Sequence, residues 1–279
     1  MFNVKWQIPY FLIMDGYYYT VVCILTALLG LCVGSFLNVV IYRLPNNMSL
    51  AKPASHCPKC NKEIKWYDNI PVISYIILGG KCRNCGDKIS PRYIFVELSN
   101  MLLWLVSFFL FFDLSSVYSI IYFATACIAC SVCIIIFFID LEHMIIFDRF
   151  QIILLVLAVV ATFTDGDSYL THGIGFVAGF AVFFVVSFFV GKATKKDSLG
   201  GGDIKFAAVA GLFLGWKRFI LMMLVASISA SIVLMIQRNK NGDEKGKEYP
   251  FAPFLTVAFV LTMFFGMPII SWYSGILLG

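Results

Sequence analysis

The sequence predicts an all-α protein that crosses a membrane several times. Of its 279 residues, 60% are hydrophobic and only 13% are charged, whereas about 25% of the residues in a soluble domain are charged. The hydrophobic residues are gathered into runs close to or above the roughly 20 residues that a helix needs to cross a bilayer. This composition excludes a soluble globular protein, a collagen-like chain and a disordered chain.

Hydropathy predicts about eight transmembrane helices. They lie at 17–42, 93–112, 117–139, 144–163, 170–191, 204–215, 218–236 and 254–278. The segment 204–215 is shorter than a full crossing, so we expect it to be tilted, extended into its flanks or re-entrant. The first segment is too long for the apolar core of a signal peptide, and only Lys5 precedes it as a basic flank. We therefore interpret it as a retained helix.

The basic residues predict how these helices are oriented. If the first helix runs from outside to inside, four loops face the cytosol. They are 43–92, 140–149, 192–205 and 237–250. These loops hold 18 Lys and Arg, against three on the opposite side, and such a bias marks the cytosolic side. The formal net charge of +5 therefore reflects membrane orientation, and no nucleic acid is expected as a partner.

The loop 43–92 is expected to form a small cytosolic domain, because aromatic and aliphatic residues lie between its polar ends. It carries two C-x2-C pairs, Cys57 with Cys60 and Cys82 with Cys85, separated by 21 residues. Two such pairs are typical of a structural zinc site in which four thiolates leave no open position. A disulfide or redox dithiol is the weaker alternative on the reducing side of a membrane, and unliganded thiols are a third.

The remaining five cysteines lie inside apolar segments. They are Cys23, Cys32, Cys127, Cys130 and Cys133. A metal there would need thiolates deep in hydrocarbon, which is costly. We interpret these cysteines as small hydrophobic residues in helix packing.

Two aspartates lie where predicted helices meet the cytosol. Asp140 directly follows an apolar run, and Asp203 follows three glycines at 200–202. Asp203 alone could be a helix N-cap, and Asp140 alone could be a solvated loop residue. An N-cap does not need three glycines, however, whereas a peptide backbone approaching the acid needs side chains out of the way.

Two carboxylates that share a site can hold one proton between them, as in aspartic proteases. One carboxylate then activates water while the other protonates the carbonyl oxygen of a peptide. Judged by its own helix end, Asp203 at an N-terminus is expected to be the anion and base, and Asp140 at a C-terminus the acid. Because the pair titrates as a unit, this assignment is a hypothesis.

Several motifs together resemble those of the type IV prepilin peptidases, which are bifunctional leader peptidases and N-methyltransferases. The similar segments are 34–45, 57–60, 66–75, 80–85, 89–93, 96–98, Asp140 with Asp148, and 200–205. The resemblance covers roughly residues 20–215. It implies a methyltransferase-type region at 15–112, which includes the cysteine loop, and a transmembrane peptidase domain at 113–279.

The resemblance implies specific roles for residues in the second region. Asp140 and Asp203 correspond to the catalytic aspartates of GxGD-type intramembrane proteases. The supporting motif comprises Asp148, Gly200, Gly202 and Lys205. In the family a proline usually precedes the acid at 148, and Phe147 stands there in this chain.

The resemblance also implies partners and a location. The substrates would be type IV prepilin or pseudopilin precursors, cut after the glycine that ends a short basic leader. S-adenosylmethionine would then methylate the new N-terminal residue. The enzyme would lie in a bacterial cytoplasmic membrane, in contact with lipid, with the cysteine loop and both aspartates on the cytosolic side.

No motif reveals a cofactor pocket, since there is no G-x-G-x-x-G in a βαβ unit. Glu97, Asn38 and Arg43 are the polar residues that we single out as candidates for binding S-adenosylmethionine. The alternatives are interhelical hydrogen bonding for Glu97 and Asn38, and lipid-headgroup anchoring for Arg43.

Three other functions compete with this interpretation. One is a peptidase without methyltransferase activity. A second is a proton-coupled transporter, which explains neither the glycine run nor the cysteine loop. The third is a membrane scaffold whose zinc loop docks a cytosolic partner. The sequence does not indicate an oligomeric state.

Overall fold

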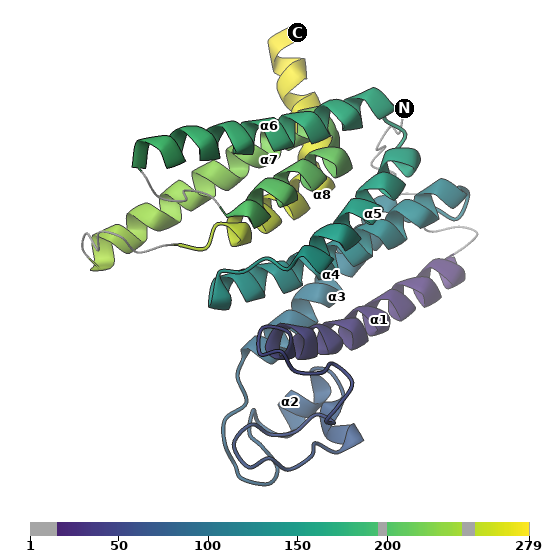
Figure 1. Ribbon diagram of the computed structural model, residues 1–279. Helices are drawn as coiled ribbons and strands as arrows, with labels where there is room; N and C mark the ends of the chain where they lie inside the picture. The colour runs from purple at the N-terminus through teal and green to yellow at the C-terminus, as the bar shows by residue number, and fades with distance from the viewer. Residues whose placement is uncertain (1–15, 195–199, 242–248, 279) are drawn as a thin grey trace. The chain divides into compact units, whose positions relative to one another are not determined.

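The computed structural model describes residues 16–194, 200–241 and 249–278, and these residues are mainly helical (Figure 1). Its helices are α1 (Gly16–Arg43), η2 (Trp66–Asn69), α2 (Ile73–Ile77), α3 (Arg92–Phe111), α4 (Val117–His143), α5 (Asp148–Thr164), α6 (Tyr169–Thr194), α7 (Gly201–Asn241) and α8 (Ala252–Leu278). The described residues form no strand beyond two isolated β-bridges. Lys5 and parts of the loops 192–205 and 237–250 lie outside the described residues.

Six of these helices are long and apolar enough to cross a membrane, namely α1, α3, α4, α6, α7 and α8. The prediction of an all-α polytopic membrane protein is thereby confirmed. The segment 144–163 corresponds to α5, whose 17 residues are fewer than a typical crossing requires. The segments 204–215 and 218–236 are joined in α7, which is interrupted at Gly215, where φ is 73° and ψ is 161°.

The chain divides into two compact units, one of residues 6–110 and one that contains residues 111–279. In the first unit, α1 and α3 pack closely through the glycines of a G-x-x-x-G pattern. A Cβ on Gly30 would lie 2.9 Å from the Cα of Met101, and one on Gly34 would lie 2.8 Å from the Cα of Glu97. Small residues at this spacing let two membrane helices approach backbone to backbone. Asn100 adds a 2.7 Å hydrogen bond to the Gly30 carbonyl.

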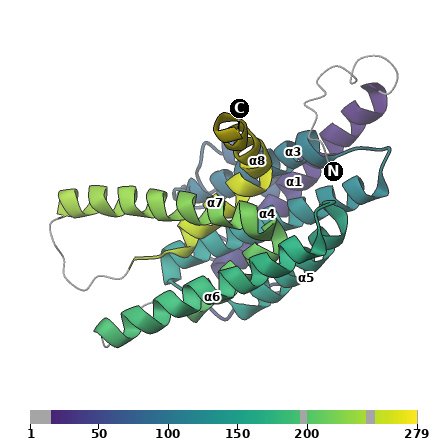
Figure 2. The same cartoon turned by 90° about the horizontal axis from the view of Figure 1, so that it is seen from above.

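The second unit is a bundle of α4 to α8 in which α6 runs beside α7 (Figures 1 and 2). Contact between these two helices is closest at Gly175 and Gly211, where a Cβ on either residue would overlap the backbone of the other. Phe206 and Phe213 on α7 and Phe259 on α8 are almost fully buried, and Phe259 makes edge-to-face contacts with both. α4 contacts α5 and α8, and α7 contacts α5 and α8. The cytosolic ends predicted for α4 and α7 are therefore held in one bundle.

Candidate active site and metal centre

Asp140 lies in the last turn of α4, and its residue is only 6% exposed. The helix ends sharply after it because Met144 adopts a left-handed conformation with φ of 54°, and the Met144 N–H bonds to the Asp140 carbonyl at 2.9 Å. The Asp140 carboxylate accepts a 3.1 Å hydrogen bond from the backbone N–H of Ala252, the first residue of α8. One carboxylate is thus buried and held by the start of another helix.

Asp203 lies in the first turn of α7, where its N–H bonds to the Gly200 carbonyl at 3.0 Å. The preceding turn is packed against the segment that follows α4, since a Cβ on Gly202 would lie 2.9 Å from the Cβ of Ile146. Gln151 of α5 donates a 3.1 Å hydrogen bond to the Gly202 carbonyl. A Cβ on Gly201, by contrast, would meet nothing within 4 Å. The glycine at 202 is required by close packing within the bundle.

The two aspartates belong to segments that pack together, because Gly202, which precedes Asp203, contacts Ile146, which lies six residues after Asp140. Because they are 63 residues apart, the sequence alone does not show whether Asp140 and Asp203 meet. Within the part of the chain that the structure describes, the Ala252 N–H provides the one hydrogen bond that reaches either side chain. Both acids are therefore next to a helix N-terminus, Asp203 to that of α7 and Asp140 to that of α8. The acid and base assignment from each residue's own helix took no account of α8.

Asp148 and Lys205, the charged residues of the supporting motif, form an exposed ion pair. Lys205 donates a 2.6 Å hydrogen bond to Asp148, and their side chains are 57% and 67% exposed. The pair links the first turns of α5 and α7. Phe147 has φ of −74°, which is within the range that proline enforces. A proline at this position would therefore fit the backbone as it stands.

The four loop cysteines converge on one point. Their sulfur atoms all lie within 4.8 Å of one another, and no disulfide joins the described cysteines. The Sγ atoms of Cys57 and Cys85 are 3.8 Å apart. A tetrahedral zinc with Zn–S bonds of about 2.3 Å places its sulfurs about 3.8 Å apart. The cysteines are thus arranged as a four-sulfur metal site requires.

The two C-x2-C pairs sit in matching turns. The Asn61 N–H bonds to the Cys57 carbonyl and the Gly86 N–H bonds to the Cys82 carbonyl, both at 2.9 Å. Asn61 and Gly86, which each follow a second cysteine, are left-handed with φ of 54° and 72°. A 2.7 Å ion pair between Lys59 and Asp87 joins the two turns.

The thiols differ in acidity. Backbone N–H groups of Cys85 and Asn84 lower the pKa of Cys82 to about 7. The pKa of Cys85 is raised to about 11, since burial and the neighbouring thiols outweigh the hydrogen bond from the Asp87 backbone. One thiolate thus forms readily, whereas four adjacent thiolates need a cation among them.

The three candidate cofactor residues lie in the unit of residues 6–110 and have different surroundings. Arg43 is buried, and its two terminal nitrogens donate to the carbonyls of four loop residues, Ser49, Leu50, Pro53 and Ala54. Glu97 is buried in the second turn of α3 and accepts a 2.7 Å hydrogen bond from the Val72 N–H. Asn38 donates to the Tyr93 carbonyl at 3.0 Å, while its Oδ1 is buried without a partner.

One charged cluster was missed by the sequence analysis. Arg218 of α7 donates to Asp165 at 2.6 Å and to Asp167 at 3.2 Å, and His172 of α6 bonds to the second oxygen of Asp165 at 3.1 Å. Burial opposes ionisation of Asp165, but the His172 hydrogen bond and the Arg218 charge lower its pKa below the ordinary value. By the orientation predicted above, Arg218 is one of the three basic residues on the side opposite the cytosol. An arginine inside a hydrophobic run was the signal, because such a residue needs a buried partner.

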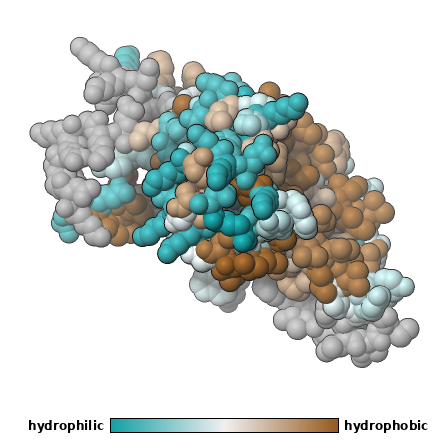
Figure 3. All heavy atoms as spheres, turned by 90° about the horizontal axis from the view of Figure 1, so that it is seen from below, coloured by the Kyte–Doolittle hydropathy of each residue, from teal (hydrophilic) through white to brown (hydrophobic). Residues whose placement is uncertain are grey.

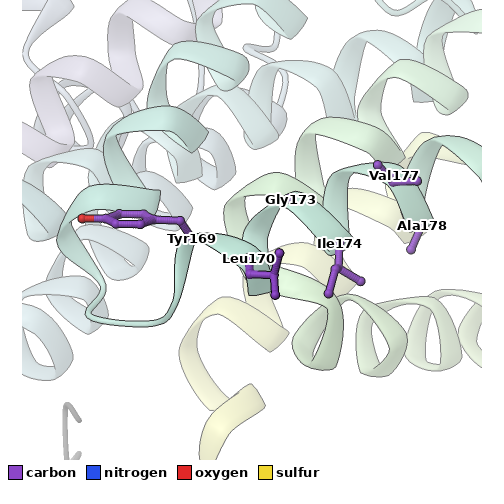
Figure 4. A pocket seen from close by; sticks show the side chains of 6 residues that line it. All are labelled: Tyr169, Leu170, Gly173, Ile174, Val177 and Ala178. Atoms are coloured by element: carbon purple, nitrogen blue, oxygen red, sulfur yellow. The ribbon is translucent and has the colours of Figure 1, made fainter.

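A surface pocket lies on α6 (Figure 4). All six lining residues belong to the first three turns of that helix: Tyr169, Leu170, Gly173, Ile174, Val177 and Ala178. Their side chains are apolar apart from the Tyr169 hydroxyl, and the pocket contains none of the predicted site residues.

Comparison with known proteins matches both parts of the chain to families. The model of the bacterial peptidase A24 N-terminal domain matches residues 28–111, and that of the type IV leader peptidase family matches residues 127–235. No solved structure matches the chain.

Curated relatives carry the name prepilin leader peptidase/N-methyltransferase. The protein from Legionella pneumophila is 30% identical over 278 residues, covering 90% of this chain and 94% of that protein. The one from Vibrio cholerae is 32% identical over 258 residues, covering 86% of this chain and 96% of its own. The one from Myxococcus xanthus is 34% identical over 221 residues, but the match spans only 64% of its length.

Proposed function

This chain belongs to the family of type IV leader peptidases, and from that membership we propose how its residues divide two reactions. The protein is a membrane peptidase and N-methyltransferase that acts on type IV prepilins. We propose that cleavage occurs after the glycine that ends the leader, at the cytosolic membrane face. The basic loops on that side support this orientation.

We propose Asp140 and Asp203 as the catalytic pair. The observation that carries this proposal is the packing of the Gly202 turn, which precedes Asp203, against Ile146, which follows the end of α4 that carries Asp140. Two carboxylates that share a site hold one proton between them, because ionising both is costly. The Ala252 N–H favours negative charge on Asp140, so Asp140 is the ionised partner and Asp203 carries the proton.

The reaction follows from this arrangement. The Asp140 carboxylate removes a proton from water, and the water oxygen attacks the carbonyl carbon of the scissile peptide. Asp203 gives its proton to the carbonyl oxygen, which produces a neutral tetrahedral diol. The proton gained by Asp140 then passes to the leaving nitrogen as the C–N bond breaks. One hydroxyl of the diol returns its proton to Asp203, which forms the carboxyl group of the product and restores both acids to their starting states.

The four cysteines are proposed to hold a structural zinc ion. Their spacing fits the sulfur tetrahedron of that ion. A zinc ion there would have no open position for substrate. It would cross-link the two turns of the loop and so fix the segment that precedes α3.

We propose Glu97 and Asn38 as contacts of the methylation site. A buried carboxylate and a buried amide oxygen without a partner suit a ligand that presents ammonium or amino groups. S-adenosylmethionine, which supplies the methyl group, carries an amino group, and the substrate presents its new N-terminal amine. Glu97 would take up the proton that this amine must lose. Arg43 is given a structural role, because loop carbonyls occupy its terminal nitrogens.

One experiment tests both halves. The purified protein is incubated with a prepilin, with and without S-adenosylmethionine, and the products are weighed by mass spectrometry. We expect Asp140→Asn and Asp203→Asn to abolish prepilin cleavage. Both variant proteins should still methylate a pilin that is supplied without its leader. Cleavage that survives either substitution would refute the aspartate pair. Cleavage by the wild type without added methyl mass would refute the methylation site alone.

A further inference from the structure

The short helix α2 turns its apolar face outward. Ile73, Ile76 and Ile77 are 54%, 67% and 71% exposed, whereas Ser74 is only 7% exposed. The three isoleucines are spaced i, i+3 and i+4, which puts them on one side of a helix. In a loop of a soluble protein, this side would be expected to face the interior.

Two contacts from opposite sides of the turn hold α2 in this orientation. The Ser74 hydroxyl donates a 2.9 Å hydrogen bond to the Tyr67 carbonyl. The N–H of Val72, which precedes the helix, donates to Glu97 at 2.7 Å. Val72 has φ of 61°, which is rare for a β-branched residue and has to be maintained by its surroundings. The exposed isoleucine face is thus specified by the surrounding structure.

The loop around this helix is bound to the membrane at both ends and is strongly basic. It joins α1 to α3, and both are long and apolar enough to cross a bilayer. From 43 to 92 it has nine Lys and Arg against three Asp and Glu. All six lysines of the loop are exposed: Lys52, Lys59, Lys62, Lys65, Lys81 and Lys88. Seen from below, hydrophilic side chains gather in the middle of the view (Figure 3).

Trp66 adds a second sign of an interface. It lies in η2, which contacts α2, and it is 81% exposed beside Lys65. Tryptophan and lysine are enriched where a membrane meets water, because each combines an apolar body with a polar end. Basic segments next to a membrane helix are attracted to anionic lipid headgroups. A basic prepilin leader is disfavoured by the same charges.

We propose that the isoleucine face of α2, consisting of Ile73, Ile76 and Ile77, inserts into the headgroup region of an anionic phospholipid surface. The exposed lysines of the loop contact the lipid phosphates around it. This contact keeps the cysteine site and the Val72 turn at the membrane surface, beside the start of α3. It does not depend on either proposed reaction.

Photo-crosslinking of the full-length protein identifies what lies against this face. Ile76→p-benzoylphenylalanine is compared with Glu63→p-benzoylphenylalanine, a matched control because Glu63 is also an exposed side chain of the loop. Both variants are reconstituted into vesicles of phosphatidylethanolamine and phosphatidylglycerol, irradiated and digested for mass spectrometry. Retained prepilin cleavage verifies that each variant is folded.

We expect lipid adducts at position 76 and few at 63, with phosphatidylglycerol enriched about fivefold over its share of the lipid. The proposal is overturned by crosslinks from position 76 to residues 111–279, which would show that the second unit covers the face. Crosslinks to another copy of the chain or to an added prepilin overturn it as well. The proposal is also overturned if positions 76 and 63 give equal lipid adducts, or if position 76 gives none.

Discussion

The backbone N–H of Ala252 donates a 3.1 Å hydrogen bond to the carboxylate of Asp140, although the two residues are 112 positions apart. It places the start of α8 against the end of α4. A hydrogen bond from a backbone amide to a carboxylate favours the charged form of that carboxylate. The helix in which an acid resides is therefore an insufficient guide to its role. In the proposed pair, the hydrogen bond from the start of α8 favours the ionised form of Asp140.

Gly202 and Gly201 make a matched pair for testing how the site is positioned. A methyl group at 202 would lie 2.9 Å from the Cβ of Ile146 and would push the first turn of α7, with Asp203, away from the segment between α4 and α5. Displacing a reacting group by about 1 Å can reduce the rate about 100-fold. We therefore expect Gly202→Ala to lower kcat for prepilin cleavage by about 10- to 100-fold.

Gly201→Ala is the control, because its methyl group would meet nothing within 4 Å. We expect it to cleave prepilin within about twofold of the wild-type rate, since an alanine in a helix is favoured over glycine. The comparison is made by steady-state cleavage with each variant in the same detergent. Equal losses at 201 and 202 would mean that these glycines act in some way other than packing against Ile146.

The parts of this protein that were predictable from sequence are those encoded locally. Runs of apolar residues specify the membrane helices, and the cysteine spacing specifies the site formed by Cys57, Cys60, Cys82 and Cys85. The predicted segments 204–215 and 218–236 meet at the break at Gly215, where the backbone leaves helical geometry between the two parts of α7. The approach of Asp140 to Asp203 depends on packing between helices, which no local pattern contains.

Packing between distant segments also explains why the sequence did not reveal the Arg218 cluster or the role of Arg43. Arg218 looked like an outer flanking residue, because its partners Asp165 and Asp167 belong to a different loop. Arg43 looked like a cofactor or lipid contact, but the chain that follows it folds back onto its guanidinium. In both cases the sequence shows a charge in an apolar context, and only the tertiary structure supplies its partner.

Loss of one loop cysteine should abolish metal binding by the loop. We expect the wild type, purified without chelator, to contain about one zinc per chain and Cys60→Ser to contain little, because structural zinc takes four protein ligands. Elemental analysis of the purified protein measures this. Cys32→Ser is the control, since Cys32 lies in α1 outside the cluster. Wild-type protein without stoichiometric zinc would contradict the proposal.

Substituting Glu97 should separate the two activities. Glu97→Gln keeps the shape of the side chain and an oxygen that can accept from the Val72 N–H, but it cannot take up a proton from an amine. General-base catalysis typically contributes about 100-fold or more. We expect methylation of a leader-free pilin to fall by about that factor while cleavage stays within about twofold.

Glu63→Gln is the matched control for that experiment, because Glu63 is an exposed acid of the same loop. It should leave both reactions unchanged. The two rates are measured by mass spectrometry on one preparation of each variant. If Glu97→Gln slowed cleavage and methylation equally, Glu97 would act by supporting the fold, and the methylation role would be withdrawn.

Asp165 and Asp167 bind the same arginine, but they should differ sharply in their effect on stability. The Asp165 side chain is 5% exposed and its oxygens bond to Arg218 and His172, so Asp165→Asn removes the buried one of the two acids that pair with the buried Arg218. Such losses cost about 3–5 kcal/mol in the free energy of unfolding. The Asp167 side chain is 39% exposed, so Asp167→Asn should cost less than about 1 kcal/mol. Thermal unfolding in one detergent measures both.

The pH dependence of this difference follows from the pKa of Asp165. Burial alone would raise it, but the His172 hydrogen bond and the Arg218 charge lower it below its ordinary value, which is about 3.9. The stabilisation is therefore complete above that value and is lost as the pH falls through the lower pKa of the folded protein. The gap between wild type and Asp165→Asn should shrink as the pH falls below about 4. A gap that instead grew as the pH fell would show that Asp165 is protonated in the folded protein.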